Sequence, residues 1–286
     1  MNHPQSRFAV VTGGTDGIGA ATARALRAAG ADVVIVGRSQ EKADALLRAD
    51  KSHGGTGSMS TIVADLAEMK NVITVVDEVA DRTDHIDLLV HAAGILITRT
   101  EHTTEGIEKD FAVGYLSRFV FLEHAARRSL LSRSTRMVNI AASAPTIPWY
   151  ARMEFSSQTE VEARVGMRSH GQAQLANDLL TAQAPTRYGI TAIGYGPGAV
   201  NTSIRREVPH AAQAIMKPFY ARVTRQPEEV GAELLAVLLD PAVPAGSATI
   251  RNRKGTFPAA AYVADPARQH ELIMVSEALA ARALGS

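Results

Sequence analysis

Residues 10–19 read VVTGGTDGIG and decide the fold. An apolar β-branched run leads into Gly13, Gly17 and Gly19, and a helical pattern follows. Glycine permits a tight turn and lets the backbone approach a pyrophosphate, while the free N–H groups that begin a helix attract an anion. The order of strand, glycine turn and helix therefore predicts a dinucleotide site, with a turn that holds no ligand as the alternative.

Further along the chain, short apolar runs alternate with longer helical patterns. Predicted strands cover residues 8–12, 32–36, 60–63, 86–91, 136–141 and 190–195, and predicted helices cover 18–29, 40–50, 68–81, 105–131, 170–184 and 227–238. This alternation predicts an α/β fold with a doubly wound parallel sheet, Rossmann-like, with helices on both faces. No linker separates two units, so one domain over residues 1–286 is expected.

Two irregular stretches follow predicted strands at their carboxyl ends, where doubly wound sheets bind ligands. Residues 143–168 are predicted to form a substrate loop, and residues 196–226 a lid-like segment. The first stretch carries Trp149, Tyr150 and Phe155, and clustered aromatic side chains suit a flat or conjugated substrate. The alternative is an aromatic loop that packs on its own domain.

The second and third strands indicate which cofactor is bound. An NAD site would place an acidic side chain after the second strand, and Arg38 stands there instead. Its planar guanidinium suits a 2′-phosphate, which favours NADP over NAD, although a solvated arginine would look the same. Asp65 follows the third strand and could accept a hydrogen bond from an adenine amino group, or cap the next helix.

Composition excludes several classes of site. The chain has no cysteine, so disulfides and thiolate chemistry are excluded, and its nine scattered histidines predict no metal site. A net charge of +1 gives no reason to expect a nucleic acid or membrane partner. No apolar run is long enough to span a bilayer, and residues 1–7 do not resemble a signal peptide, so a cytoplasmic location is expected.

With these motifs in view, the chain resembles the short-chain dehydrogenase/reductase superfamily over nearly its whole length. The resemblance rests on residues 12–19, 65–66, 91–94 (HAAG) and 197–202 (PGAVNT). Residues 111–116, 171–177 and 265–277 are most similar to its retinol-dehydrogenase and WW-domain-oxidoreductase-like branch. The resemblance implies NADP(H) as cofactor and these binding residues: Gly13, Thr15, Gly17, Ile18, Gly19, Arg38, Asp65, Leu66, Ala93, Gly94, Pro197, Gly198 and Val200.

The same resemblance exposes a degenerate catalytic tetrad. The family's redox chemistry rests on an asparagine, a serine, a tyrosine and a lysine, and the matching positions here are Gly114, Ala142, His170 and Gln174. No shift of the alignment restores the lysine, because residues 110–216 contain none. The resemblance therefore implies an unusual member rather than a standard carbonyl reductase.

Four residues could carry chemistry instead. His170 and Gln174 are four apart on a predicted helix, so both should face one cleft, and an imidazole can exchange protons at neutral pH. The alternative is a histidine that fills a gap near the helix start. Ser143 could serve if the preceding strand bulges, and Tyr195, at the end of the sixth strand, could reach the cleft or lie in the core.

Three functions remain open. The first is a non-redox enzyme that promotes cyclisation, isomerisation or elimination of a small aromatic or polyketide-like metabolite, with the cofactor in a structural role. The second is an atypical NADPH-dependent oxidoreductase with His170 as proton donor, and the third is a non-catalytic protein that binds NADP or a metabolite. The partner expected is a small molecule, and a homo-oligomer could form, since related enzymes pair through the fifth and sixth helices.

Overall fold

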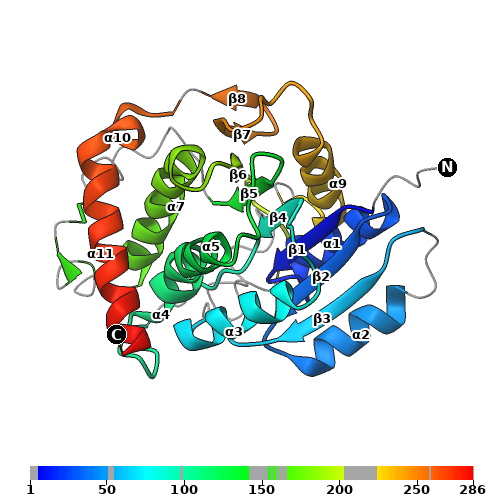
Figure 1. Ribbon diagram of the computed structural model, residues 1–286, viewed down its shortest axis with the longest axis horizontal. Coiled ribbons are helices and arrows are strands. Elements are labelled where there is room, and N and C mark those ends of the chain that lie inside the picture. The colour runs from blue at the N-terminus through cyan, green and yellow to red at the C-terminus, as the bar shows by residue number, and fades with distance from the viewer. Residues whose placement is uncertain are drawn as a thin grey trace.

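A parallel sheet forms the centre of the molecule. The computed structural model describes residues 6–50, 55–96, 99–141, 154–155, 157–158, 161, 166–202, 224–257 and 259–285. Eight strands lie in the order β3-β2-β1-β4-β5-β6-β7-β8 (Figure 1). They are β1 Phe8–Thr12, β2 Asp32–Gly37, β3 Met59–Val63, β4 Leu88–His91, β5 Arg136–Ile140, β6 Thr191–Gly196, β7 Ala248–Asn252 and β8 Gly255–Phe257.

The order of the strands sets the position of the ligand crevice. Strands β1 to β7 all run parallel to one another, and β8 pairs antiparallel with its neighbour, β7. The chain builds β1, β2 and β3 toward one edge and then returns to place β4 on the other side of β1. In a doubly wound sheet, this reversal opens a crevice at the carboxyl ends of the strands, here of β1 and β4.

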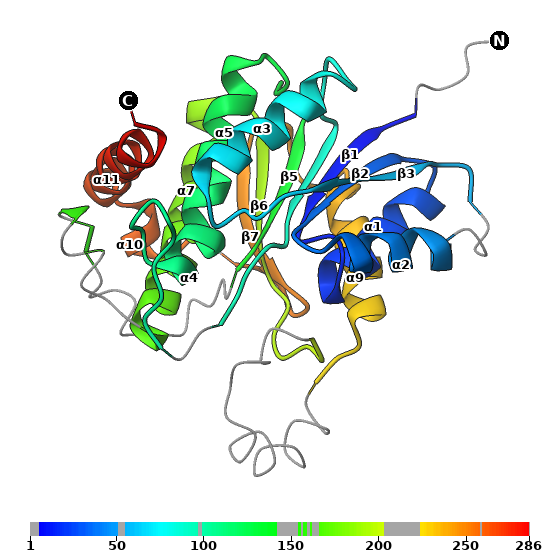
Figure 2. The same ribbon diagram turned by 90° about the horizontal axis from the view of Figure 1, so that it is seen from below.

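Helices cover both faces of the sheet, as Figure 2 shows. Helices α1, α2 and α9 cover one face, while α3, α5 and α7 cover the other. Their bounds, with those of the remaining helices, are α1 Gly17–Ala28, α2 Gln40–Asp50, α3 Met69–Ala80, α4 Lys109–Phe111, the π-helix η1 Ala112–Leu116, α5 Ser117–Arg127, α7 Met167–Tyr188, α9 Pro227–Leu238, α10 Ala261–Ala264 and α11 Pro266–Leu284.

The hydrophobic core has two parts, one on each face of the sheet. In β1, Val10 packs toward α3, α5 and α7, whereas its neighbour Val11 packs toward α1 and α9. Successive strand residues point to opposite faces, so each buried strand supplies both cores. The predicted α/β class and doubly wound sheet are confirmed by this arrangement.

The predicted helix over residues 105–131 is wrong as a single element. Gly106 sits in a turn at φ +78°, and only residues 109–127 are helical, as α4, η1 and α5 in succession. The apolar pattern does not distinguish one helix from three consecutive segments here, because all five residues of η1 are buried. Four elements from β7 to α11 were not predicted at all.

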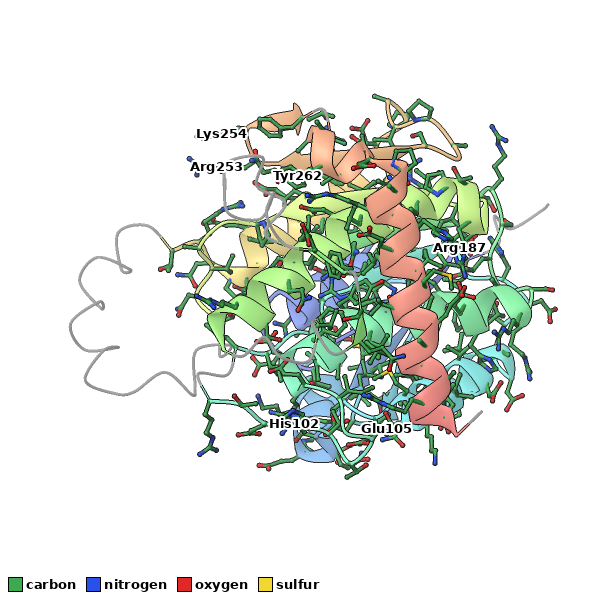
Figure 3. The ribbon with its side chains drawn as sticks, turned by 90° about the vertical axis from the view of Figure 1, so that its left-hand side faces the viewer. His102, Glu105, Arg187, Arg253, Lys254 and Tyr262 are labelled. Atoms are coloured by element: carbon green, nitrogen blue, oxygen red, sulfur yellow. The ribbon has the colours of Figure 1, made fainter. Side chains whose placement is uncertain are left out.

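The outermost helix, α11, lies against the layer that contains α7. Tyr115 of η1 and Ser276 of α11 are hydrogen-bonded at 2.7 Å in the interior. Arg187 of α7, labelled beside α11 in Figure 3, donates to Glu123 of α5 at 2.6 Å and to Glu277 of α11 at 2.7 Å. Helix α11 therefore covers part of the outer surface of α7 and η1. Within the described part of the chain, no helix is both long and apolar enough to cross a membrane.

Candidate functional site

The glycine turn after β1 lies directly against the backbone that follows β4. Gly13 has φ +69°, and a Cβ added there would lie 2.6 Å from the backbone nitrogen of Ala93. A Cβ at Gly19 would lie 2.2 Å from the carbonyl oxygen of Gly13. Only glycine fits either position, so the turn can expose its backbone to a ligand at close range. Ala93 itself is buried, and Gly94 beside it is exposed.

Helix α1 begins within this turn and adds the anion-binding character of a helix start. The side chain of Asp16 accepts a hydrogen bond from the backbone N–H of Gly17 at 2.8 Å. That carboxylate alone would repel a pyrophosphate, but the ammonium of Lys42 on α2 pairs with it. The ion pair offsets the negative charge at the helix start, so the turn remains suited to a phosphate group.

On the β2 side, the residues expected to hold the adenosine half lie at the strand ends. Arg38 is exposed directly after β2. Thr15 packs against Gly37, where an added Cβ would lie 2.6 Å from the threonine Oγ1. Asp65 accepts a hydrogen bond from the N–H of Ala67 at 3.0 Å, so it caps a turn ahead of α3, and its adenine contact stays a prediction. Leu66 is buried beside it.

The segment after β6 closes the other side of the crevice. A Cβ added at Gly17 would lie 3.0 Å from Cγ2 of Thr202, so this segment touches the glycine turn. Gly198 lies within it, exposed, at φ +73°, and Pro197 beside it is half-buried. Val200 is buried and pairs with Arg225 across a short bridge. The ends of β1, β4 and β6 thus converge on one turn, a geometry that fits a dinucleotide.

A carboxylate–imidazole pair stands at the start of α7. Nδ1 of His170 lies 3.1 Å from Oδ1 and 3.2 Å from Oδ2 of Asp110. The carboxylate side chain is only 1% exposed, whereas the imidazole is 21% exposed. A buried acceptor thus holds an imidazole that still reaches solvent, the arrangement that a general acid or base requires.

Gln174 lies beside His170 on α7. Its Nε2 lies 3.3 Å from Nε2 of His170, one helical turn away. With Nδ1 facing a carboxylate, the network assigns the proton of the neutral ring to Nδ1 and leaves Nε2 as an acceptor. The contact places the side chains of His170 and Gln174 together, while their shared cleft stays a prediction, and sequence reasoning missed Asp110 as the partner of His170.

Gly114 lies beside the pair, in the π-helical turn. A Cβ added there would meet Oδ1 of Asp110 and Cβ of Ala173, each at 3.4 Å. A side chain at this position would therefore start in contact with the carboxylate, and the match of Gly114 to the family's asparagine stays a prediction. π-Helical turns within helices occur frequently at functional sites.

A second buried carboxylate lies two residues before Asp110. Glu108 accepts from the N–H of Phe111 at 2.8 Å and from Oγ of Ser169, both through Oε2. Its Oε1 is buried without a partner in the described part of the chain. Burial raises the pKa of this carboxyl above its usual range, although the two hydrogen bonds lower it.

The expectation that Tyr195 could reach the cleft is wrong. Its ring is packed in the core under α1 and α9, on the face of the sheet opposite α7. Its hydroxyl donates to Glu233 of α9, which also pairs with Arg225 at 2.6 Å. The cause is strand alternation, because Ile193 and Tyr195 of β6 share that face.

The remaining candidates are placed only in part. Phe155 is buried in the core on the α7 side, which leaves little of its ring for a substrate. Ser143, Trp149 and Tyr150 lie outside the described residues, so their roles stay predictions. Among the residues that the structure describes, no group of three histidine, cysteine or acidic side chains could hold a metal ion.

Comparison with known proteins gives the family. A short chain dehydrogenase family model matches residues 7–213. A probable oxidoreductase of Streptomyces lividans is 32% identical over 213 residues, 71% of this chain and 67% of that protein. Human polyprenol dehydrogenase is 26% identical over 232 residues, 78% of this chain and 69% of that protein. Mouse retinol dehydrogenase 12 is 26% identical over 203 residues, 70% of this chain and 63% of that protein.

Solved structures show the same fold. The crystal structure of a variant actinorhodin polyketide ketoreductase with NADPH aligns at a TM-score of 0.62 with 23% identity, covering 88% of this chain and 97% of that one. The complex of Pseudomonas aeruginosa RhlG with NADP aligns at 0.65 with 23% identity and the same coverage. By its sequence and its sheet, this chain belongs to the short-chain dehydrogenase/reductase superfamily.

Proposed function

We propose that this protein binds NADP(H) and uses His170 as an acid/base group on a small, aromatic or polyketide-like metabolite, without hydride transfer. The observation that carries the proposal is the pair of His170 with the buried carboxylate of Asp110. In the family, a tyrosine and a lysine occupy the positions of His170 and Gln174. The pair thus supplies a proton-exchanging group where the reductive groups are missing.

The glycine turn supports the cofactor. Backbone at Gly13 and Gly17, the start of α1 and the segment after β6 together form the cradle, and a side chain at Gly13 would push the turn away from the backbone of Ala93. Exposed Arg38, with Lys42 close by on α2, supports a 2′-phosphate and hence NADP rather than NAD. Membership of the family supports the same cofactor, and so do the two similar structures that were solved with NADPH and NADP.

The proton path follows from the hydrogen bonds. Asp110 holds the Nδ1 proton of His170 and fixes the plane of the ring. Nε2 then receives a proton from the substrate and returns it at another atom, while the amide of Gln174 orients the ring or the substrate oxygen. Moving one proton between two sites on one molecule suffices for isomerisation, elimination or an aldol-type ring closure.

A second candidate is an NADPH-dependent reductase in which His170 donates the proton. The specific observation that favours it is the family, because the named relatives are called dehydrogenases or oxidoreductases. A bound nicotinamide would supply the hydride, and the imidazole would supply the proton to the substrate oxygen. The two candidates share the same residues and differ in whether the cofactor is consumed.

The test follows both NADPH absorbance and product mass with a panel of aromatic ketones, quinones and polyketide-like substrates. Conversion without loss of NADPH is expected, with the mass unchanged for an isomerisation or ring closure and lowered by the leaving group, such as one water, for an elimination. Consumption of NADPH in step with a gain of two hydrogens would select the reductase. His170→Ala should abolish most turnover, while His124→Ala, at a second histidine–aspartate pair on α5, serves as the matched control. NADPH binding without turnover of any substrate would favour a binding protein.

The cellular location and the assembly of the protein are also proposals. We propose a cytoplasmic protein that acts on a small molecule and has no nucleic acid or membrane partner. If copies associate, they do so through surface that α11 leaves open, because this helix already bonds to α7 and η1.

A further inference from the structure

A buried arginine lies beneath the crevice, outside the acid/base pair. Arg118 of α5 is only 4% exposed. Its guanidinium donates at 2.8 Å to the carbonyl oxygen of Ala93, which follows β4, and at 2.8 Å to that of Ile140, which ends β5. It therefore joins the carboxyl ends of two neighbouring strands.

No carboxylate in the described part of the chain pairs with this guanidinium. Its third acceptor is the side-chain oxygen of Asn139, and all three acceptors are neutral. Its Nε has no partner in the described part of the chain. Burial lowers the pKa of Arg118 to about 9, and no carboxylate opposes that shift. An uncompensated buried cation is costly, so its retention needs a reason beyond packing.

Hydrogen bonds link Arg118 to the acid/base pair. Asn139, which accepts from Arg118, donates to the backbone oxygen of Asn177 on α7 at 3.1 Å. Asn177 in turn donates to the carbonyl oxygen of Gly114 at 2.8 Å. The chain of bonds ends in the π-helical turn beside Asp110. One buried network thus runs from the loop after β4 to the turn that carries the proton-exchanging site.

The cofactor places a charge at the same end of the sheet. The adenosine half belongs on the β2 side, so the nicotinamide half belongs above β4 and β5. The oxidised nicotinamide ring carries a positive charge, and the reduced ring is neutral. A cation beneath β4 and β5 repels the first form and leaves the second unaffected.

We propose that Arg118 makes the site selective for NADPH over NADP⁺ by placing a buried positive charge under the nicotinamide half of the crevice. This inference rests on the proposed NADP(H) binding. As a general scale, two unit charges roughly 10–15 Å apart at an effective dielectric constant of about 20 change a binding constant about tenfold, and this is the order of effect expected here. A site that retains the reduced cofactor rather than oxidising it also agrees with proton chemistry at His170.

The test measures the dissociation constants of NADP⁺ and NADPH by calorimetry for the wild type and for Arg118→Met, Arg118→Gln and Arg118→Lys. The ratio Kd(NADP⁺)/Kd(NADPH) should fall about tenfold in the Met and Gln variants, and Lys should keep most of it. Arg136→Met is the matched control. Arg136 also donates to backbone carbonyls, those of Val243 and Asp240, but from the amino end of β5.

The outcomes separate the two proposals. An unchanged ratio in a folded Gln or Met variant that binds both forms would overturn the role of Arg118 and leave the cofactor assignment intact. A wild type that binds neither form would overturn the proposed function itself. An equal fall in Arg136→Met would mean that the ratio reports general loosening, which also rejects the proposal.

Discussion

Replacing Asp110 by asparagine is the most direct test of the acid/base pair. The carboxylate contacts Nδ1 of His170 through both oxygens, at 3.1 and 3.2 Å, and its side chain is almost completely buried. A hydrogen bond to a charged group contributes about 1.5–3 kcal/mol. That range corresponds to about a 10- to 100-fold preference for the ring tautomer with the proton on Nδ1. Asparagine removes the charge and can donate to Nδ1, so the preference should collapse or reverse.

The tautomer is read from the ¹⁵N chemical shifts of the His170 ring, which requires no substrate. In the wild type the protonated nitrogen should be Nδ1, and in Asp110→Asn the population should move to Nε2. Once a substrate is found, kcat should fall by about 10- to 100-fold, with a smaller change in KM. The variant keeps the size of the side chain, so folding should survive.

Asp77 offers a matched control. It lies 2.9 Å from Nε2 of His124, in a more exposed pair on the surface between α3 and α5. Asp77→Asn removes a histidine–aspartate contact of the same kind without touching α7. A His170 ring that keeps its wild-type tautomer in Asp110→Asn would refute the assigned role, as would equal effects of both substitutions on turnover.

Two further predictions concern stability and the cradle. Glu108→Gln should raise the Tm at neutral pH. The pKa of the Glu108 carboxyl is near 4.5 in the unfolded chain and is raised in the folded protein. The folded protein therefore loses stability as the pH rises from the lower pKa through the higher one, and glutamine, which does not ionise, removes that loss. Thermal melts between about pH 4 and 8 should show the gain growing with pH, and a gain that is constant or shrinks contradicts the assignment. Gly13→Ala should destabilise the fold by about 1–2 kcal/mol, because it adds a Cβ at positive φ against Ala93. It should also raise the Kd for NADPH of the protein that remains folded. An unchanged Kd would argue against the cradle.

Periodicity in the sequence predicted most of the fold because strands and helices of the doubly wound sheet bury long, regular faces. β1 was predicted with its exact bounds, and α2 and α9 likewise, since each has a uniform environment along its length. The elements from β7 to α11 were missed. β7 has one buried residue, Ile250, and no alternation of buried with exposed residues, and β8 has three residues, too few for a pattern.

The site was predictable to the extent that it follows from local geometry. The spacing of four on a helix brought His170 and Gln174 together, as expected. Asp110 could not be found that way, because it contacts a residue 60 positions away and its partner depends on how α4 and α7 pack. A signal was nevertheless present, since Asp110 is a charged residue directly before the apolar run FAV and is buried with it. The expectation for Tyr195 rested on its position near the end of β6. It did not allow for the alternation of side chains along a strand, which places Tyr195 on the face of the sheet away from α7.

The two proposals together rest on where charge is placed. In the proposed alignment, the family's lysine stands on the helix corresponding to α7, one turn beyond the proton donor, and the neutral Gln174 stands there in this chain. A buried cation, Arg118, lies instead on α5, bonded to the ends of β4 and β5. If both proposals hold, this cation acts on the cofactor while the anion of Asp110 acts on the His170 ring. We propose that this separation of the two charges uncouples proton movement from hydride movement, which is the reason to test proton chemistry first.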